Sequence, residues 1–251
     1  MKVLITGASS GIGLEMAKYL AEKKHELILV ARDKEKLEKV QEELPTKVKI
    51  IVADLANEQK AKELYVLVNK ENIDVLINNA GFGDCGYFTE TDLSKELDMI
   101  DTNIKAVHIL TKSFLKDMEE RDSGYILNVA SSAAFQPGPL MATYYATKAY
   151  VLHLTEAIYY EQKKKKSNVH ISALCPGPVA TNFDNVANVK FSIKQMSSEE
   201  VARYAIDKMF EEKMIIIPGV KMKLSKFFGR FASDKMLLKI AYGVQRKKVN
   251  K

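Results

Sequence analysis

Residues 2–13 read K-V-L-I-T-G-A-S-S-G-I-G. The continuous apolar run at the start predicts a short first strand that is buried on both faces. A loop with three glycines follows in the spacing Gly7-x-x-x-Gly11-x-Gly13, and residues 14–24 repeat apolar side chains at helical intervals. A strand, a glycine-rich loop and a helix in this order bring backbone N–H groups and a helix N-terminus against a pyrophosphate. The stretch therefore predicts a dinucleotide-binding loop, in a spacing that differs from the commoner fingerprint.

The rest of the chain alternates apolar strands with helical runs. Strands are expected at residues 26–31, 47–53, 73–78, 125–130, 169–174 and 214–217. Helices are expected at residues 34–44, 57–70, 91–121, 143–166 and 197–211, and the third of these is expected to break near residues 101–103. This alternation predicts an α/β fold whose strands form a doubly wound parallel sheet with right-handed crossovers. A chain of 251 residues is expected to form a single domain of this kind.

Composition and charge argue against several classes of function. The net charge is +6, but residues 211–251 hold eleven Lys or Arg against three Asp or Glu, whereas the rest of the chain holds 27 against 29. No nucleic-acid binding is expected, since the positive excess is confined to the C-terminal segment. Cys85 and Cys175 provide neither a disulfide framework nor metal-ligand spacing, and the first residues do not predict a signal peptide. We expect no metal and a cytoplasmic location.

Two segments in the last third of the chain differ from the regular pattern. Residues 182–200 begin without a strong period and are interpreted as a flexible region over the site. Residues 219–251 form a basic amphipathic extension, in which basic and apolar side chains alternate at helical spacing. One interpretation is a helix pair that lies on an anionic membrane surface. The other is a pair of helices that covers the pocket or forms a subunit contact.

A second stretch, residues 128–148, carries the groups suited to chemistry. It reads N-V-A-S-S-A-A-F-Q-P-G-P-L-M-A-T-Y-Y-A-T-K. The end of a buried strand is followed by Ser131, then by a loop with two prolines and a glycine, and then by a helical pattern that contains Tyr144 and Lys148. Residues at positions i and i+4 share one face of a helix, so this tyrosine and this lysine are expected to be neighbours.

A tyrosine beside a lysine can move protons. The nearby positive charge favours phenolate, so Lys148 is expected to lower the pKa of Tyr144 from its ordinary value of about 10. The tyrosine can then exchange a proton with a carbonyl or alcohol oxygen, to which Ser131 can also hydrogen-bond. The spacing Tyr-x-x-x-Lys occurs five times in this chain, and only Tyr144 follows a strand that ends in serine. Asn103 is a further candidate, because an asparagine within a helix is mildly unfavourable and invites a reason.

The end of the second strand bears on the choice of dinucleotide. An acidic residue at this place would hold the ribose 2′-hydroxyl of NAD, but the sequence has Ala31 followed by Arg32. A guanidinium suits a 2′-phosphate better, so NADP(H) is favoured over NAD(H). Asp33 is interpreted as the N-cap of the following helix. Asp54, at the end of the third strand, either accepts a hydrogen bond from adenine or caps the next helix, and the sequence leaves both open.

Taken together, these motifs resemble the short-chain dehydrogenase/reductase family over roughly residues 1–220. The resemblance rests on Thr6-Gly7-x-x-x-Gly11-Ile12-Gly13, Asn78-Asn79-Ala80-Gly81, Ser131, Tyr144-x-x-x-Lys148 and Pro176-Gly177, in the order and spacing of the family. It implies a Rossmann-type fold, a nicotinamide cofactor and a catalytic tetrad of Asn103, Ser131, Tyr144 and Lys148. The cofactor contacts that it implies are Gly7, Ser9, Ser10, Gly11, Ile12, Gly13, Arg32, Asp54, Leu55, Asn79, Ala80, Gly81, Tyr144, Lys148, Pro176, Gly177, Val179 and Thr181.

The resemblance also implies a reaction, in which a hydride passes between the nicotinamide and a carbonyl carbon. Tyr144 would exchange the proton, Ser131 would polarise the carbonyl, Lys148 would bind the nicotinamide ribose, and Asn103 would hold a water. Ser132 lies one position beyond the catalytic register and is the alternative serine. The substrate is expected to be a small lipophilic ketone, aldehyde or secondary alcohol, and the protein is expected to be a homodimer or homotetramer. The expected apolar pocket residues are Phe82, Tyr87, Phe135, Leu140, Met141 and Phe183.

Two other functions are compatible with parts of this pattern. A non-catalytic sensor or scaffold that binds NADP could use the same fold, because fold does not determine function. A relative of the nucleotide-sugar epimerases and dehydratases would share Tyr-x-x-x-Lys. The spacing of Gly7, Gly11 and Gly13 disfavours the second of these.

Overall fold

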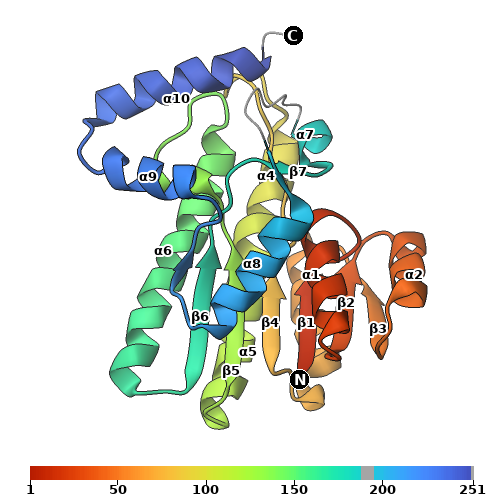
Figure 1. Cartoon of the computed structure of the whole chain (residues 1–251). Helices are drawn as coiled ribbons and strands as arrows, with labels where there is room; N and C mark the ends of the chain where they lie inside the picture. The colour runs from red at the N-terminus through yellow and green to blue at the C-terminus, as the bar shows by residue number, and fades with distance from the viewer. Residues whose placement is uncertain (188–194, 250–251) are drawn as a thin grey trace.

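The computed structural model describes residues 1–187 and 195–249, which form a parallel sheet with helices on both faces (Figure 1). The strand order is β3-β2-β1-β4-β5-β6-β9, and every neighbouring pair is parallel. The strands are β1 Lys2–Thr6, β2 Glu26–Ala31, β3 Val48–Val52, β4 Val75–Asn78, β5 Gly124–Val129, β6 Val169–Leu174 and β9 Ile215–Ile216. The predicted doubly wound parallel sheet is confirmed.

The helices follow the predicted runs closely. They are α1 Gly11–Glu22, α2 Lys34–Glu43, α3 Glu58–Val68, α4 Leu93–Ile100, α5 Val107–Glu120, α6 Ala142–Lys165, α8 Ser198–Phe210, α9 Val220–Gly229 and α10 Asp234–Val249. Short turns of helix lie at η1 Asn69–Glu71, η3 Ser132–Phe135 and α7 Phe183–Val186. Alternate strand residues point to opposite faces of the sheet, so Val3 and Ile5 pack with α1 and α8, whereas Leu4 packs with α3 and α5.

Ligands of open α/β sheets bind where the strand order reverses, at the carboxyl ends of the strands. Here the order reverses between β1 and β4. The side chain of Asn79, which follows β4, donates from Nδ2 to the carbonyl oxygens of Thr6 at 3.0 Å and Gly7 at 3.1 Å. This amide therefore joins the loop after β4 to the glycine loop after β1.

The predicted break in the helix near residues 101–103 is a π-helix. It is η2, Asp101–Ala106, which links α4 to α5. A π turn adds a residue to the helix and is frequent at functional sites. Asn103 lies within it and is fully buried, so the irregular turn places a polar side chain inside the molecule.

A buried polar network joins the central strands to two helices. The amide of Asn78 on β4 donates to Asn128 on β5 at 2.9 Å and to Thr111 on α5 at 3.1 Å. Asn128 in turn donates from Nδ2 to the hydroxyl of Thr155 on α6 at 3.0 Å. Buried polar groups stabilise a fold only when they are paired in this way. The network fixes α5 and α6 against the end of the sheet that bears the site.

The two C-terminal helices lie above the carboxyl edge of the sheet, and α10 crosses the top of the molecule in Figure 1. The predicted flexible region 182–200 is structured where it is described. Residues 183–186 form α7, β8 (Met196–Ser197) pairs with β7 (Val179–Ala180), and residues 198–200 begin α8, while residues 188–194 lie outside the described residues. Across residues 1–187 and 195–249, no helix has the length and apolar character that a membrane crossing requires.

Candidate active site

A single cavity of about 950 Å3 runs from the glycine loop, past the carboxyl ends of the central strands, to helices α9 and α10. The predicted cofactor contacts line it, except Gly13, and so do Ser131, Tyr144 and Lys148. Asn103 does not line it. The structure therefore brings residues from the loop after β1 to helix α10 together around one continuous space. Two of the predicted residues, Gly13 and Asn103, do not line this space.

The glycine loop has the backbone form of an anion cradle. Gly7 and Gly11 have φ values of 65° and 57°, in the left-handed region that glycine adopts without strain. Helix α1 begins at Gly11, its N-cap Ser10 makes no side-chain cap hydrogen bond, and its first turn has no acidic side chain. The first N–H groups of a helix lack intrahelical partners and attract anions. The residues present thus fit a pyrophosphate.

Gly13 serves this cradle from behind. A Cβ at this position would stand 2.4 Å from the carbonyl oxygen of Gly7 and 2.4 Å from Nδ2 of Asn79. Gly13 does not line the cavity, and its expected contact with the ligand stays a prediction. Its missing side chain allows α1 to pack closely under the loop, which is the role of the third glycine in such turns.

Two cations line the far end of the cavity beside β2. Arg32 is exposed there, as expected, and Lys36 of α2 lies in the same wall. Asp33 accepts a hydrogen bond from the backbone N–H of Lys36 at 3.0 Å and pairs with its ammonium at 2.8 Å. The interpretation of Asp33 as an N-cap is confirmed. Lys36 was not anticipated, although its place one turn into the helix after Arg32 is visible in the sequence.

Asp54 is not a helix cap, which settles one open alternative. Asn57 caps α3 by accepting a hydrogen bond from the backbone N–H of Lys60. One carboxylate oxygen of Asp54 accepts from the N–H of Ala56 at 3.1 Å, and the residue lines the cavity. The carboxylate therefore stands in a tight turn at the cavity wall.

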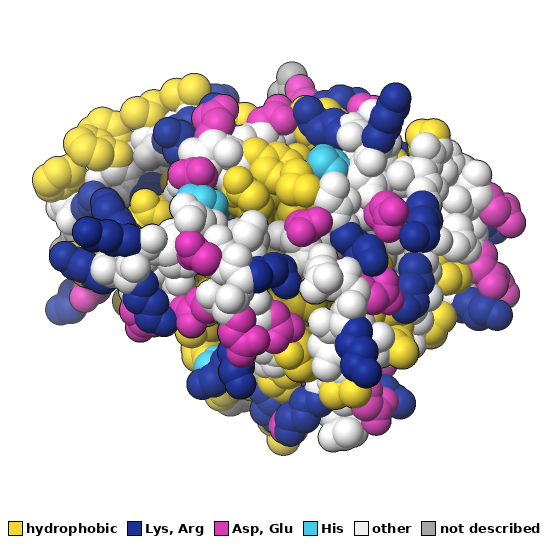
Figure 2. Space-filling view, turned by 90° about the horizontal axis from the view of Figure 1, so that it is seen from below, with side chains coloured by type: hydrophobic (Ala, Val, Ile, Leu, Met, Phe, Trp, Pro, Cys, Tyr) yellow, Lys and Arg dark blue, Asp and Glu magenta, His cyan; other side chains and the backbone are white. Residues whose placement is uncertain are grey.

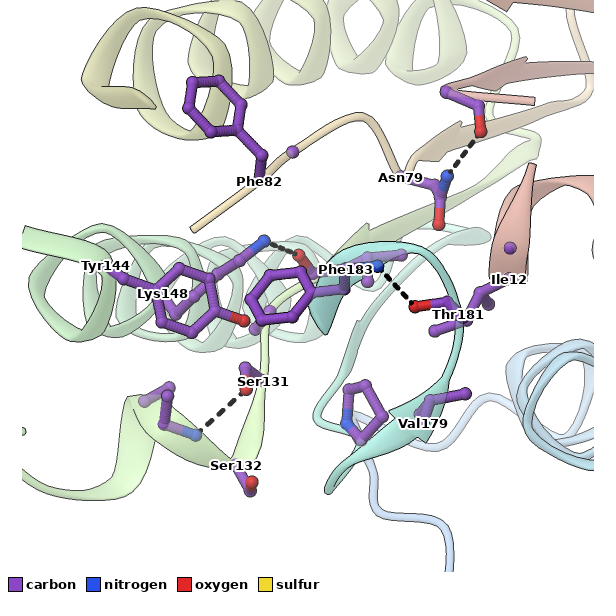
Figure 3. Close-up of a pocket in the computed structure, with 18 of the residues that line it drawn as sticks. Ile12, Asn79, Phe82, Ser131, Ser132, Tyr144, Lys148, Val179, Thr181 and Phe183 are labelled. Atoms are coloured by element: carbon purple, nitrogen blue, oxygen red, sulfur yellow. Dashed lines mark hydrogen bonds between the residues drawn. The ribbon is translucent and has the colours of Figure 1, made fainter. Parts of the chain in front are cut away.

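The predicted proton-transfer groups meet at the end of β5 (Figure 3). The Ser131 side chain lies beside that of Tyr144, and its hydroxyl oxygen accepts a hydrogen bond from the backbone N–H of Ala133 at 3.1 Å. The Lys148 ammonium donates to the carbonyl oxygen of Val129 at 2.9 Å and lies 5.9 Å from the centre of the Tyr144 ring. Figure 3 shows the side chain of Ser132 directed away from Tyr144. This geometry favours Ser131 over Ser132 as the serine of the site.

Burial controls the charge state of these groups. It raises the pKa of the Tyr144 hydroxyl to about 12, and the neighbouring Ser131 side chain opposes part of that rise. It also lowers the pKa of the Lys148 ammonium to about 8. The expectation that Lys148 brings the pKa of Tyr144 below its ordinary value is wrong in direction, because burial removes the phenolate from water and Lys148 is not among the groups that lower this pKa. Tyr144 therefore keeps its proton throughout the neutral pH range.

Asn103 organises the wall beside the site. Its Oδ1 accepts from the N–H of Phe82 at 3.1 Å, and its Nδ2 donates to the carbonyl of Phe82 at 2.9 Å and to Thr147 at 3.0 Å. A Cβ on Gly81 would lie 2.8 Å from Oδ1 of Asn103 and 3.3 Å from Nζ of Lys148. Asn103 thus fixes the loop after β4 against α6 without reaching the cavity.

The middle of the cavity has apolar walls. Four of the six expected pocket residues line it, namely Phe82, Phe135, Met141 and Phe183. The ring of Phe183 lies 5.3 Å from that of Tyr144, centre to centre. Tyr87 and Leu140 were expected but lie elsewhere: the Tyr87 hydroxyl bonds that of Tyr242 at 3.1 Å, and Leu140 is buried away from the cavity.

Helices α9 and α10 form one side of the cavity, and the sequence did not predict which of their residues line it. Met222 of α9 packs over Gly177, because a Cβ added to Gly177 would lie 2.9 Å from Cγ of Met222. The ammonium of Lys226 lies 4.7 Å from the centre of the Phe135 ring. Gln245 of α10 donates from Nε2 to the hydroxyl of Tyr145. The interpretation of the extension as helices that cover the pocket is therefore confirmed.

Comparisons with known proteins agree with this geometry. The sequence profile of the short chain dehydrogenase family matches residues 1–190. Hydroxysteroid dehydrogenase-like protein 1 of Gallus gallus is 34% identical over 215 residues, which are 81% of this chain and 63% of that protein. Very-long-chain 3-oxoacyl-CoA reductase of Anas platyrhynchos is 34% identical over 197 residues, which are 75% of this chain and 62% of that protein. The chain thus spans less than two thirds of the length of these curated relatives.

A solved structure extends the similarity to nearly the whole chain. A short-chain dehydrogenase from Sphingobium yanoikuyae in complex with NADPH is 28% identical, with a TM-score of 0.83. The match covers 92% of this chain and 93% of that one. The similarity in fold therefore continues past residue 190, where the family profile ends.

The buried ammonium of Lys148 should titrate at an unusual pH. We expect its proton to leave near pH 8, because burial disfavours the charged form. Between about pH 8 and the ordinary lysine value of about 10.4, the unfolded chain holds this proton and the folded chain does not. This group therefore makes the folded state more stable as pH rises through that interval.

Protein labelled with 15N at the lysine ammonium groups would be titrated by NMR. The signal assigned to Lys148 is the one that disappears in Lys148→Met. If that signal keeps its proton to pH 10, the proposed cost of burial is contradicted.

Proposed function

The chain belongs to the short-chain dehydrogenase family, and we propose that it is an oxidoreductase that transfers a hydride between a nicotinamide dinucleotide and a carbonyl carbon or its secondary alcohol. One observation carries this proposal: Ser131, Tyr144 and Lys148 meet in the cavity that begins at the glycine loop. When bound, the nicotinamide supplies or accepts the hydride. The residues of the chain position the reactants and move the proton.

Each residue of the site has a distinct part in this chemistry. The Ser131 hydroxyl hydrogen-bonds the carbonyl oxygen and polarises the bond. Tyr144, which lies beside Ser131, gives that oxygen its proton in the reducing direction. Lys148 faces the same wall and holds the nicotinamide ribose. Asn103 is a positioning residue, since its amide is engaged by Phe82 and Thr147.

The charge state of Tyr144 supports carbonyl reduction as the favoured direction. A hydroxyl whose pKa is raised to about 12 is protonated at neutral pH and can act as a general acid. Tyr144 would give up its proton as the carbonyl carbon is reduced, and the Lys148 ammonium lies 5.9 Å from the centre of the Tyr144 ring. The cation therefore acts on the charge that develops during the reaction.

The substrate that fits best is a lipophilic ketone or aldehyde. Aromatic and aliphatic side chains from β5, α6 and α7 form the wall around Tyr144, together with Phe82. A pocket of this kind gains its affinity from buried apolar surface. The names of the two curated relatives, which refer to a hydroxysteroid and to a very-long-chain acyl group, point to the same class of compound.

NADP(H) is the proposed cofactor, in preference to NAD(H). Arg32 and Lys36 place two cations where the ribose 2′-position would lie, and the carboxylate of Asp33 is engaged by Lys36. A phosphate gains charge-assisted hydrogen bonds from such groups. The solved relative with NADPH is consistent with this choice. A cytoplasmic homodimer or homotetramer is the proposed setting.

A weak contact with an anionic membrane surface is proposed for the C-terminal helices. Their outer side exposes large apolar side chains beside basic ones, and Figure 2 shows hydrophobic side chains gathered at the upper left edge, on the side to which α9 projects in Figure 1. Elsewhere on the face in Figure 2, basic and acidic side chains are mixed. The exposed apolar residues are Val220, Leu224, Phe227, Phe228, Phe231, Met236, Leu238, Ile240 and Val244. Since the same helices line the cavity, a lipophilic substrate could enter from that surface.

Replacement of the Tyr144 hydroxyl tests the mechanism. In Tyr144→Phe, ketone reduction should fall at least about 10²-fold in kcat, because the proton donor is lost while the ring is kept. The assay follows NADPH oxidation over ketones and aldehydes of graded size. Tyr160→Phe is the matched control, because Tyr160 has the same Tyr-x-x-x-Lys spacing on α6 but is exposed. Tight NADPH binding without turnover in the unmodified protein would instead favour the sensor or scaffold.

Removal of the two cations near β2 tests the cofactor preference. In Arg32→Ala with Lys36→Ala, the Kd for NADPH should rise at least about tenfold, while that for NADH changes little. The constants are measured by the fluorescence of the reduced nicotinamide. Lys34→Ala is the control, since Lys34 pairs with Glu38 and does not line the cavity. Equal losses for both cofactors would contradict the assignment.

Vesicle co-sedimentation tests the membrane contact. The unmodified chain should bind phosphatidylserine-rich vesicles more strongly than phosphatidylcholine vesicles, and Phe228→Glu with Phe231→Glu should abolish that binding. Leu67→Glu is the control, because Leu67 is a similarly exposed apolar residue on α3. If neither the unmodified chain nor the Phe228→Glu, Phe231→Glu variant binds vesicles, and the double substitution dissociates an oligomer, the surface is a subunit contact instead.

A further inference from the structure

One face of helix α9 lines the cavity. Its members recur at helical intervals of three and four residues, and they are Met222, Ser225, Lys226, Gly229 and Arg230. Two of them are cations, so this side of the cavity differs from the apolar wall around Tyr144. Lys226 is half-buried and Arg230 is exposed, which places the arginine nearer to solvent.

These two cations have no acidic partner. The side chains of Lys226 and Arg230 form no ion pair and no hydrogen bond with any residue that the structure describes. Lys36, by contrast, lines the opposite end of the cavity and pairs with Asp33 at 2.8 Å. A cation in a partly closed site gains most from an anion that the ligand itself brings. The charge on α9 is therefore available to a bound molecule.

The ammonium of Lys226 is held in place although it lacks a counter-ion. It lies 4.7 Å from the centre of the Phe135 ring, and an aromatic face attracts a cation. Glu156 of α6 also lines the cavity, and it acts on the pKa of the buried Cys175 thiol in the direction opposite to Lys226. Its carboxylate lies 3.1 Å from Nδ1 of His153 and makes no ion pair with α9. The two cations thus exceed the nearby negative charge.

Gly229 leaves room beside these cations. A Cβ at this position would meet no atom within 4 Å, although the residue lines the cavity. Its φ is not in the left-handed region, so the backbone does not require a glycine here. Residues three positions apart are neighbours on a helix surface, so this open space adjoins Lys226. A group of the ligand can therefore reach the cation.

The cations of α9 lie far from the pair proposed to bind the cofactor. Arg32 and Lys36 stand beside the end of β2, whereas Met222 of α9 packs over Gly177, which follows β6. Strands β1, β4 and β5 separate β2 from β6. Neighbouring strands are spaced by about 4.8 Å, so the two places are roughly 19 Å apart along the sheet. A phosphate at the end of β2 cannot contact both.

We propose that Lys226 and Arg230 form a subsite for an anionic group of the substrate, a carboxylate or a phosphate, remote from the reacting carbonyl. This refinement rests on the proposed function: the apolar wall around Tyr144 holds the carbon chain, and α9 binds its charged end. The substrate class is then an amphipathic keto acid or keto phosphate rather than a wholly apolar ketone. An ammonium and a guanidinium both form charge-assisted hydrogen bonds with such groups.

Paired ketones test this assignment. The probes are methyl ketones with a terminal carboxylate on chains of graded length, each paired with its methyl ester. At the best length the acid should exceed the ester in kcat/KM by at least about tenfold, because hydrogen bonds to charged groups are the stronger ones. In Lys226→Gln with Arg230→Gln the ratio should fall to about one, while kcat/KM for the esters is kept.

Matched variants separate a local site from the general charge of the helices. Lys221→Gln with Lys239→Gln removes two exposed cations of α9 and α10 that do not line the cavity, and it should leave the ratio unchanged. Gly229→Leu keeps both cations and fills the space beside them, so it should lower the ratio.

A second readout does not depend on turnover. The hydroxy acids and their esters, in which the reacting group is already reduced, are titrated by calorimetry against the protein saturated with NADP+. The preference for the acid should be present in the unmodified chain and absent in Lys226→Gln with Arg230→Gln. If no ketone is reduced but this preference in binding persists, the proposed function fails and the anion subsite stands.

Two outcomes overturn the proposal. One is an equal response to acid and ester at every chain length in the unmodified chain, in both readouts. The other is a Lys226→Gln, Arg230→Gln variant that keeps the preference for the acid but no longer binds phosphatidylserine vesicles, since the cations then bind a lipid headgroup instead.

Discussion

The hydrogen bond from the Lys148 ammonium to the carbonyl oxygen of Val129 is the contact on which the site depends. It joins α6 to the end of β5, so it fixes the position of the helix along its axis relative to the sheet. Tyr144 lies one turn before Lys148 and therefore meets Ser131, which follows β5 by two residues. The bond also offsets part of the cost of burying a cation, because a desolvated ammonium needs acceptors. A shift of α6 by a single residue would separate all three groups.

Buried polar contacts elsewhere make such a shift difficult. Asn128 reaches from β5 to Thr155 on α6, two turns beyond Lys148, and Asn103 reaches Thr147 from the π-helix. These are amide and hydroxyl groups that cannot be exposed to water without unfolding, so each holds the helix in one register. The π turn that places Asn103 inside the fold has its physical reason here. A regular helix would advance the side chain by a different angle and leave the Thr147 hydroxyl without this donor.

Local sequence patterns predicted the sheet, the glycine loop and the pairing of Tyr144 with Lys148, because each depends on neighbours within one strand, loop or helix. The meeting of these two residues with Ser131 joins a strand end to a helix, and the order of the motifs, which resembles that of the family, predicted it. These patterns did not predict whether a motif residue lines the cavity or packs behind the residues that line it. Gly13 and Asn103 carry family motifs, yet they act from behind the wall. The pKa of Tyr144 was misjudged because spacing reveals a nearby charge but not the degree of burial. Lys36 and Gln245 were missed for different reasons: the first depends on the direction in which α2 leaves the sheet, and the second contacts a residue 100 positions away.

The C-terminal helices give this chain a pocket that the sheet alone would leave open. Their inner face closes the cavity beside Tyr145 and Phe135, and their outer face is apolar and basic. Tyr144 and Lys148 are covered by other elements, since Tyr144 packs with Ala133 and Phe183 and Lys148 donates to Val129, and this burial perturbs both pKa values. The reactive groups are therefore buried by the strand ends and their neighbouring helices, whereas the helices at the end of the chain close the side of the cavity beside Tyr145 and Phe135.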